Sequence, residues 1–234
     1  MSFEGRHVVV TGGTGALGVA VVARLLEQGA MCHVPNLDGG EMTRFPHRDH
    51  ERVRLRGGID LTSEDAVDGF YDDVAELWAS VHLAGGFAMA PIAEAGSAAF
   101  VDQMNMNALT CYLCCRAAAR RIRAASAGGG RIVNVAARPA LEPRLGAGMV
   151  AYTAAKSAVA AITASLAEEL ADDGIWVNAV APSILDTPAN RAAMPDADHA
   201  RWPGVDDVAR TIVFLASPDN LATRGGVIPV TGRS

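Results

Sequence analysis

The chain has 234 residues, of which 50% are hydrophobic and 20% are charged, and its formal net charge is −6 at pH 7. This length suits one α/β domain with a large core, and the negative charge argues against nucleic acid as the main partner. No stretch approaches the ~20 unbroken apolar residues of a membrane span, so no membrane partner is expected.

In chain order, short apolar runs alternate with longer amphipathic stretches that are rich in alanine. The expected elements are a strand at His7–Val10, a helix at Ala16–Gln28, strands at Met31–Val34, Arg52–Leu55 and Trp78–Leu83, two consecutive helices over Ser97–Ala125, a strand at Arg131–Val135, a helix at Met149–Ala171, a strand at Ile175–Ala181, a helix at Val205–Ala216 and a last strand at Val227–Val230. Strands that alternate with helices pair in parallel through right-handed crossovers. The pattern predicts an α/β fold in a single domain over residues 1–234, with a doubly wound parallel sheet and helices on both faces.

One long connection interrupts this alternation. The stretch from Ser183 to Pro203 is irregular and contains three prolines and a tryptophan. Connections of this length in compact domains are usually functional lids or disordered segments. We expect residues 183–203 to form a lid over a small-molecule substrate.

The cysteines and histidines show no spacing typical of metal ligands. Cys111, Cys114 and Cys115 crowd one expected helix, which suits neither a disulfide framework nor a complete metal cage. The N-terminal residues carry no basic-then-apolar signal pattern. We therefore expect a cytoplasmic protein that binds no metal and whose cysteines fill the core in a reducing compartment.

A glycine-rich turn follows the first expected strand and opens the first expected helix. It reads Thr-Gly-Gly-Thr-Gly-Ala-Leu-Gly from Thr11 to Gly18. Glycines let the backbone approach a pyrophosphate closely, and a helix N-terminus offers unpaired N–H groups and a positive dipole end. The alternative is an ordinary glycine-rich turn. The strand–turn–helix context favours a dinucleotide site.

The only lysine of the chain, Lys156, follows Tyr152 by four residues, whereas arginine occurs nineteen times. Positions four apart lie on one face of a helix. A lysine ammonium is compact and its pKa is easily changed by its surroundings, whereas a guanidinium is a planar fork that stays protonated. The pair is thus a candidate for proton chemistry. A surface lysine beside an incidental tyrosine is the alternative.

These motifs occur in the order typical of a classical short-chain dehydrogenase/reductase, and the resemblance covers essentially the whole chain. The residues that carry it are Thr11-Gly12 through Gly18, Asp60-Leu61, Ala84-Gly85, Asn107, Tyr152, Lys156, and Asn178-Ala179-Val180-Ala181-Pro182 with Thr187. The resemblance implies a Rossmann-like fold, NAD or NADP as cofactor, and a homodimer or homotetramer built partly by the helix that carries Tyr152.

The resemblance also implies roles for single residues. Tyr152 would be the general acid/base, Lys156 would hold the nicotinamide ribose and lower the pKa of Tyr152, and Asn107 would order a water in a proton relay. The cofactor would contact Gly12, Thr14, Gly15, Ala16, Leu17, Gly18, Asn36, Asp60, Leu61, Ala84, Gly85, Tyr152, Lys156, Pro182, Ile184 and Thr187.

The most consequential departure from the family pattern is the missing catalytic serine. Ala136 and Ala137 stand where the family has a serine pair, and neither can donate a hydrogen bond to a substrate oxygen. Loss of such a donor can cost on the order of 10²–10³ in rate. Arg138, Arg144 and Thr153 are near in sequence, and the choice between them stays open.

A second departure concerns the adenosine ribose. Asn36 occupies the position of the acidic residue that usually binds it, and Asn can bond a ribose hydroxyl without repelling a 2′-phosphate. The basic stretch Arg44–Arg48 is a candidate contact for such a phosphate, and a solvated loop is the alternative. The preference between NAD and NADP therefore stays open. In the turn itself, Ala16 replaces the family's middle glycine.

Some segments resemble dihydropteridine reductases, which also lack the serine. The shared features are Ala84-Gly85-Gly86 followed by Phe87, the Ala136-Ala137 pair, and a run from Leu185 to Trp202 in the expected lid. Phe87, Ala137 and Trp202 are therefore candidate substrate contacts, with aromatic faces for a planar ring. Packing of Phe87 in the wall and of Trp202 under the lid is the alternative.

These observations predict an NAD(P)-dependent oxidoreductase that moves a hydride between nicotinamide and a carbonyl, alcohol or imine-type carbon, with Tyr152 handling the proton. Dihydropteridine reductase-type activity is the named alternative. A catalytically silent nucleotide-binding regulatory or scaffold protein is the alternative of another class, since fold does not fix function.

Overall fold

The computed structural model describes residues 2–125 and 128–234, so residues 1, 126 and 127 of the expected domain lie outside the described residues. Its centre is one parallel sheet in the strand order β3-β2-β1-β4-β5-β6-β7. The strands are β1 (His7–Thr11), β2 (Met31–Pro35), β3 (Val53–Arg56), β4 (Leu77–His82), β5 (Gly130–Val135), β6 (Ile175–Pro182) and β7 (Val227–Val230). Each expected strand is present with nearly the expected bounds. The prediction of a doubly wound parallel sheet is confirmed.

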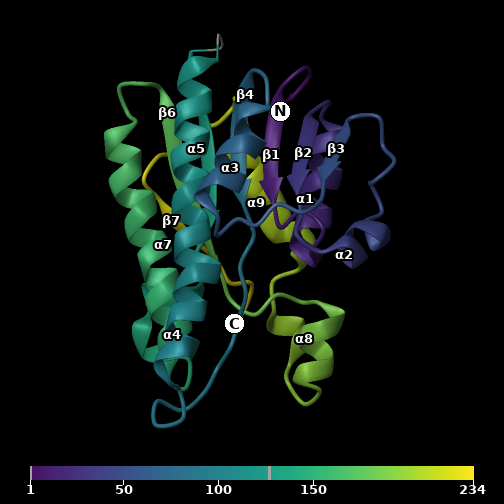
Figure 1. Cartoon of the computed structure of the whole chain (residues 1–234). Helices are drawn as coiled ribbons and strands as arrows, with labels where there is room; N and C mark the ends of the chain where they lie inside the picture. The colour runs from purple at the N-terminus through teal and green to yellow at the C-terminus, as the bar shows by residue number, and fades with distance from the viewer. Residues whose placement is uncertain (1, 126–127) are drawn as a thin grey trace.

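Helices cover both faces of this sheet (Figure 1). They are α1 (Ala16–Glu27), α2 (Gly39–Arg44), α3 (Glu64–Asp72), α4 (Ser97–Gln103), α5 (Thr110–Ala124), α6 (Arg138–Leu141), α7 (Val150–Glu169), α8 (Pro188–Ala193) and α9 (Val205–Ala216), with a π-helix η1 (Met104–Leu109) and 3-10 helices η2 (Pro143–Gly146) and η3 (His199–Arg201). Helices α1 and α9 share one buried cluster, and α3, α5 and α7 share the other.

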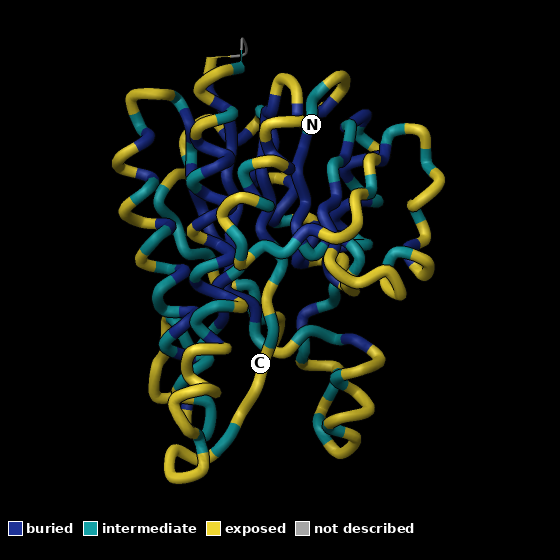
Figure 2. Tube along the Cα trace, in the orientation of Figure 1, coloured by how far each residue is buried: buried dark blue, intermediate teal, exposed yellow. Residues whose placement is uncertain are grey.

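The strands are apolar almost without interruption because both of their faces are buried. In β1, Val8 and Val10 belong to the cluster under α1 and α9, whereas Val9 belongs to the cluster under α3 and α5. Successive side chains of a strand point to opposite faces, and a parallel sheet with two covered faces needs apolar residues on both. Figure 2 shows the resulting continuous buried centre.

The crevice of the fold lies between β1 and β4. Strand β1 pairs with β2 on one side and with β4 on the other. The chain therefore leaves β1 and β4 in opposite directions along the sheet, which opens a crevice at their carboxyl ends. The loop before α4 and helix α8 both extend beyond this same end of the sheet (Figure 1).

The expectation of an irregular lid is wrong in part, because residues 183–203 contain α8 and η3. The side chain of Thr187 caps α8 by accepting a hydrogen bond from the backbone N–H of Asn190 at 3.1 Å, and proline follows as the first helical residue. Arg191 of α8 donates two hydrogen bonds, of 2.6 and 2.8 Å, to Asp186, which precedes the helix in the chain, and these bonds hold α8 against the preceding residues. The helix is thus held by side-chain hydrogen bonds. The segment has too few apolar residues for a helical pattern to be visible in the sequence.

Helix α7 is, in the part of the chain that the structure describes, the helix that is long and apolar enough to cross a membrane by length and composition. It packs along β6 and against η1. The contacts with β6 and η1 bury one side of the helix.

Candidate active site

A cleft of about 670 Å³ crosses the carboxyl ends of β1, β2 and β4. Five segments contribute to it: the turn after β1, the chain after β2, the loop after β3, the loop after β4, and the helical run before α5. The lining residues are Gly12, Thr14, Gly15, Pro35, Asn36, Leu37, Glu41, Ile59, Asp60, Leu61, Thr62, Leu83, Ala84, Gly85, Asp102, Asn105, Met106 and Thr110.

The glycine-rich turn forms one wall of the cleft. Gly12 has a φ of +64°, and a Cβ there would lie 2.7 Å from the backbone nitrogen of Ala84. A Cβ at Gly18 would lie 2.2 Å from the backbone oxygen of Gly12, so the first turn of α1 packs directly on the chain that leaves β1. Gly15 and Ala16 are exposed at the N-terminus of α1. The turn thus presents backbone N–H groups to the cleft, as an anion site requires.

Not every residue expected to contact a cofactor borders the cleft. Leu17 and Gly18 are buried behind the turn. Pro182 ends β6, Ile184 is exposed beyond it, and Thr187 caps α8. These five residues, and also Ala16, Tyr152 and Lys156, are absent from the described lining of the cleft, which lies at the ends of β1, β2 and β4.

The Tyr152–Lys156 pair lies outside the described lining of the cleft, but Lys156 is next to Gly85, which borders it. Lys156 is 7% exposed, and its Nζ donates a hydrogen bond of 2.8 Å to the backbone oxygen of Val135. Nζ lies 5.9 Å from the centre of the Tyr152 ring. The ring of Phe87 meets the Tyr152 ring edge-on, with 5.0 Å between centroids.

Asn107 is held beside this pair by an irregular helix. It lies in the π-helix η1, where its Nδ2 donates to the backbone oxygens of Gly86, at 3.0 Å, and Gln103, at 3.1 Å. A π-turn adds a residue to a helix and re-aims the side chains around it, often at a functional site. A Cβ at Gly85 would lie 2.6 Å from the Asn107 Oδ1 and 3.5 Å from the Lys156 Nζ. The end of β4 therefore joins the cleft to the Tyr152–Lys156 pair.

Burial controls the protonation of the pair. It raises the pKa of Tyr152 to about 12 and lowers the pKa of Lys156 to about 8. The expectation that the ammonium lowers the pKa of Tyr152 is wrong in this structure, because Nζ points at the carbonyl of Val135 rather than at the phenol. At neutral pH the phenol is neutral and the ammonium is mostly protonated.

We expect the lowered pKa of Lys156 to make the free energy of unfolding depend on pH. Above pH 8 the folded chain releases the proton, whereas the unfolded chain keeps it up to the ordinary pKa of 10.5. The contribution of Lys156 to stability should therefore rise with pH between these values, by at most about 1.4 kcal/mol per pH unit. Urea unfolding of the wild type and of Lys156→Met at several pH values measures it as a difference. A difference that is flat or falls across this range would contradict the assignment.

The residues near the missing serine offer no simple replacement. Ala136 and Ala137 are buried at the end of β5. Arg138 donates from Nε to the carboxylate of Glu142 at 3.0 Å, which makes it an ion-pair residue. The Oγ1 of Thr153 is buried and has no hydrogen-bond partner among the described residues, and a Cβ at Gly146 would lie 2.1 Å from it.

Trp202 packs within the lid. Its ring lies 4.6 Å from the ring of His199, and the His199 Nε2 is 2.7 Å from the backbone oxygen of Met194. Gly232 packs against the backbone of Trp202. These contacts hold Trp202 between His199 and the C-terminal residues, and its contact with a substrate stays a prediction.

The adenosine end of the cleft contains a residue that the sequence reasoning missed. Glu41, in α2, accepts hydrogen bonds from the Oγ1 of Thr14 at 2.8 Å and from the Nδ2 of Asn36 at 3.2 Å. The sequence contained a sign of this residue: Glu41 follows Asn36 by five positions and lies in the first turn of a helix that Asp38 caps. Asp60 borders the same space and accepts two hydrogen bonds from Thr62. The basic stretch 44–48 is not among the described lining residues.

A buried polar cluster lies behind the site, under α5. A ring nitrogen of His82 and the sulfur atoms of Cys111 and Cys115 lie within 4.8 Å of one another. The spacing of these residues in the sequence did not indicate this cluster. Both ring nitrogens of His82 already have neighbours, Nδ1 with the Asn134 Oδ1 and Nε2 with the Ser80 Oγ, each at 2.8 Å. We interpret the cluster as a hydrogen-bonded part of the core.

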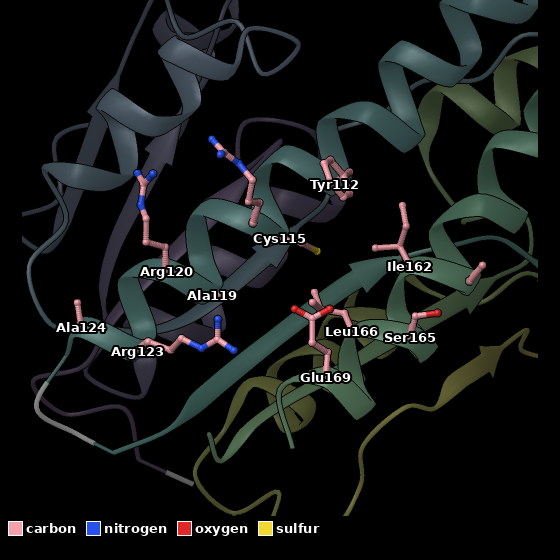
Figure 3. Close-up of a pocket in the computed structure, with 12 residues that line it drawn as sticks. Tyr112, Cys115, Ala119, Arg120, Arg123, Ala124, Ile162, Ser165, Leu166 and Glu169 are labelled. Carbon is pink, nitrogen blue, oxygen red and sulfur yellow. The ribbon is translucent and has the colours of Figure 1, made fainter. Parts of the chain in front are cut away.

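A second hollow of about 890 Å³ lies far from Tyr152, between α5 and α7 (Figure 3). Apolar side chains of both helices form its floor, and charged side chains form its rim. The lining residues are Tyr112, Cys115, Arg116, Ala119, Arg120, Arg123, Ala124, Ala161, Ile162, Ser165, Leu166 and Glu169.

Comparison with known proteins agrees with this arrangement. Residues 6–198 match the family model described as short chain dehydrogenase. The chain is 30% identical over 250 residues to the (2S)-[(R)-hydroxy(phenyl)methyl]succinyl-CoA dehydrogenase subunit BbsD of Thauera aromatica, covering 99% of this chain and 97% of the relative. It is 32% identical over 247 residues to the cis-4-hydroxycyclohexanecarboxylate dehydrogenase of Sinomonas cyclohexanicum, with the same coverage of 99% and 97%. The solved structure of ElxO with NADP bound superimposes with a TM-score of 0.88 at 25% identity, covering 97% of each chain.

Proposed function

Because the chain belongs to the short-chain dehydrogenase/reductase family, and is thus an NAD(P)-dependent oxidoreductase, we propose that its cleft binds the dinucleotide and that Tyr152 exchanges the proton of the reaction. The hydride would move between nicotinamide and a carbonyl, alcohol or imine-type carbon. The observation that carries the proposal is the convergence of Asn107 and Lys156 on Gly85, where the cleft meets Tyr152.

The residues of the cleft fit a dinucleotide. Glycine at position 12 lets the turn lie directly against the backbone of Ala84, with which a Cβ would collide, and the N-terminus of α1 is open to solvent at Gly15 and Ala16, as a pyrophosphate site requires. Asp60 and Leu61 would border the adenine, and Lys156 would hold the nicotinamide ribose. Pro182, Ile184 and Thr187 would border the nicotinamide from the lid side. When bound, the nicotinamide supplies or accepts the hydride, and the remaining chemistry belongs to the protein.

Tyr152 would act as the acid when a carbonyl is reduced. Its pKa is raised to about 12 by burial, so the hydroxyl is protonated at neutral pH and has a proton to give. The charge of Lys156, whose Nζ lies 5.9 Å from the centre of the Tyr152 ring, would stabilise the phenolate that remains, and the Asn107 relay would return a proton through ordered water. In the oxidative direction the phenol must first lose its proton, which burial disfavours.

The alanines at 136 and 137 bear on the substrate. Without a serine hydroxyl, Tyr152 is the remaining candidate to donate a hydrogen bond to the reacting atom of the substrate. A substrate whose reacting carbon needs little polarisation is therefore favoured. Phe87 meets the Tyr152 ring and leaves 58% of its own surface exposed, which offers an apolar face to a ring. Both relatives named above are dehydrogenases of substrates with a carbon ring. We propose a ring-bearing substrate.

Dihydropteridine reduction is the second candidate, supported by the same exposed Phe87 face and by the absent serine. Quinonoid dihydropterin is planar and accepts hydride at an imine-type position. A catalytically silent scaffold is disfavoured on chemical grounds, because a silent site has no need of a buried lysine beside a buried phenol.

A turnover assay tests the proposal. We expect the purified protein to oxidise NADH or NADPH in the presence of ring-bearing ketones or quinonoid dihydropterin, followed by the absorbance of the reduced nicotinamide. The matched control contains every component except the carbonyl substrate. Binding of the dinucleotide without turnover on any member of the panel would favour the scaffold. Activity on ketones alone would exclude the pteridine reading.

We also propose a cytoplasmic location and a homodimer or homotetramer. All four cysteines are free, as in a reducing compartment. The hollow between α5 and α7 combines small residues such as Ala161 and Ser165 with arginines on one helix and Glu169 on the other (Figure 3). Such a surface suits a second copy of the chain related by a twofold axis, in which each helix faces its opposite charge.

A further inference from the structure

The wall of the cleft at the end of β2 contains a three-residue network that connects three segments. The Nδ2 of Asn36 donates to the Oγ1 of Thr14 at 2.7 Å and to the Oε2 of Glu41 at 3.2 Å. The Oγ1 of Thr14 donates in turn to the same Oε2 at 2.8 Å. The end of β2, the glycine-rich turn and α2 are thereby fixed relative to one another around one carboxylate.

The network leaves one acceptor without a donor. A carboxylate only accepts hydrogen bonds, so the nitrogen of the Asn36 amide must be the atom that faces Glu41. The Oδ1 of Asn36 is then the atom left over, and it is buried without a hydrogen-bond partner among the described residues. Asn36 is 7% exposed and borders the cleft. A buried polar atom without a partner is costly unless a ligand supplies one. Here the missing partner is a hydroxyl donor.

The charge of this wall is negative. Glu41, Asp60 and Asp102 line the cleft, and no lysine or arginine does so among the described residues. The nearby Arg48 is turned away, because it donates to Asp49 at 3.0 Å and to the backbone oxygen of Thr43 at 3.3 Å. Arg56 pairs with Asp73. A phosphate bound beside Glu41 would therefore meet a like charge, and the described lining of the cleft offers no lysine or arginine to compensate it.

From these contacts we propose that Glu41, oriented by Asn36 and Thr14, binds the hydroxyls of the adenosine ribose and makes the protein selective for NAD(H) over NADP(H). The inference rests on the proposed function in that it assumes a dinucleotide in the cleft. Glu41 accepts from the ribose diol and the orphaned Asn36 Oδ1 accepts from a further hydroxyl. The carboxylate thus comes from α2 instead of from the end of β2. A 2′-phosphate would put a dianion where the diol belongs.

The test is the dissociation constant of each dinucleotide, measured by fluorescence titration with NADH and with NADPH in the absence of any substrate. We expect wild type to bind NADH at least about 10-fold more tightly than NADPH, as expected for hydrogen bonds to a charged group. Glu41→Ala should weaken NADH by about 10-fold and bring the two constants within about 3-fold of each other. Glu41→Gln keeps an acceptor but removes the charge, so its preference for NADH over NADPH should lie between the preferences of the wild type and of Glu41→Ala. Glu51→Ala, an exposed carboxylate outside the cleft, is the matched control and should leave both constants unchanged.

The outcomes separate this inference from the proposed function. Equal affinity of the wild type for NADH and NADPH, or an unchanged ratio in Glu41→Ala with native thermal unfolding, overturns the role of Glu41 while the proposed function stands. Failure of the wild type to bind either dinucleotide overturns both. Retained NADH selectivity without turnover on any carbonyl supports Glu41 and contradicts the proposed catalysis.

Discussion

Tyr152→Phe is expected to lower turnover by roughly 10²–10⁴-fold, the usual contribution of a positioned general acid. The variant removes one hydroxyl and keeps the ring, so the edge-on contact with Phe87 at 5.0 Å is preserved. The hydroxyl is not needed to hold the dinucleotide in the cleft near β1 and β2. The dissociation constant of the dinucleotide should therefore change little. Steady-state turnover and a fluorescence titration with NADH measure the two effects separately.

The matched control is Tyr112→Phe. Tyr112 is 54% exposed on α5 and lines the hollow between α5 and α7. Loss of its hydroxyl should leave both turnover and dinucleotide affinity near the wild-type values. If Tyr152→Phe kept near-wild-type turnover, the assignment of Tyr152 as the acid would be wrong.

Lys156→Arg is expected to be far from conservative, although it keeps the positive charge. The Nζ of Lys156 is buried and donates to the backbone oxygen of Val135 at 2.8 Å, in a space that holds one compact ammonium. A guanidinium is larger and planar, and overpacking of this kind typically costs about 1–3 kcal/mol. Displacement of groups at a reaction centre by about 1 Å can cost ~10²-fold in rate. We expect kcat/KM to fall by about that factor or more, together with the free energy of unfolding.

Two further variants separate size from charge at this position. Lys156→Met keeps the length and removes the charge, so it should fold and yet lose activity. Arg210→Lys, at an exposed position of α9 outside the site, is the matched control for the exchange of the two cations and should have no effect. A fully active Lys156→Arg would show that the presence of a single lysine in the chain is accidental.

The use of arginine elsewhere in the chain supports this reading of Lys156. Arg116 contacts Glu64 at 2.9 Å and Asp68 at 2.6 Å, and thereby ties α5 to α3. Arg131 lies over the rings of Trp78 and Trp176, at 5.1 and 4.6 Å from their centres. Forked, stacking contacts of these kinds suit a guanidinium. The lysine is used where the space admits only a small cation.

The strands and long helices could be predicted from the sequence because each carries its own signal. Strands such as β1 are buried on both faces and therefore read as unbroken apolar runs. The short helices α2, α3 and α8 were missed. Each has six to nine residues and begins with a side-chain cap, so its order depends on single hydrogen bonds rather than on an apolar period.

Some features of the candidate site could likewise be predicted from the sequence, and others depend on packing. The spacing of Tyr152 and Lys156 follows from helical geometry and was visible in the sequence. The position of Asn107 depends on the π-helix η1, which no local pattern indicates. The pKa of Tyr152 was predicted in the wrong direction, because burial and the orientation of Nζ toward Val135 are properties of the packed structure.

The parallel α/β architecture, the glycine-rich turn and the Tyr152–Lys156 pair could be predicted because each leaves a local pattern in the chain: apolar runs that alternate with helices, closely spaced glycines, and two residues four apart on a helix. Only the tertiary structure decided what surrounds them. Glu41 reaches Asn36 and Thr14 because α2 folds back over the end of β2, and Gly85 meets both Asn107 and Lys156 because β4 ends beside η1 and α7. Such contacts join segments from different strands and helices, and their distances are set by packing, which no local pattern records.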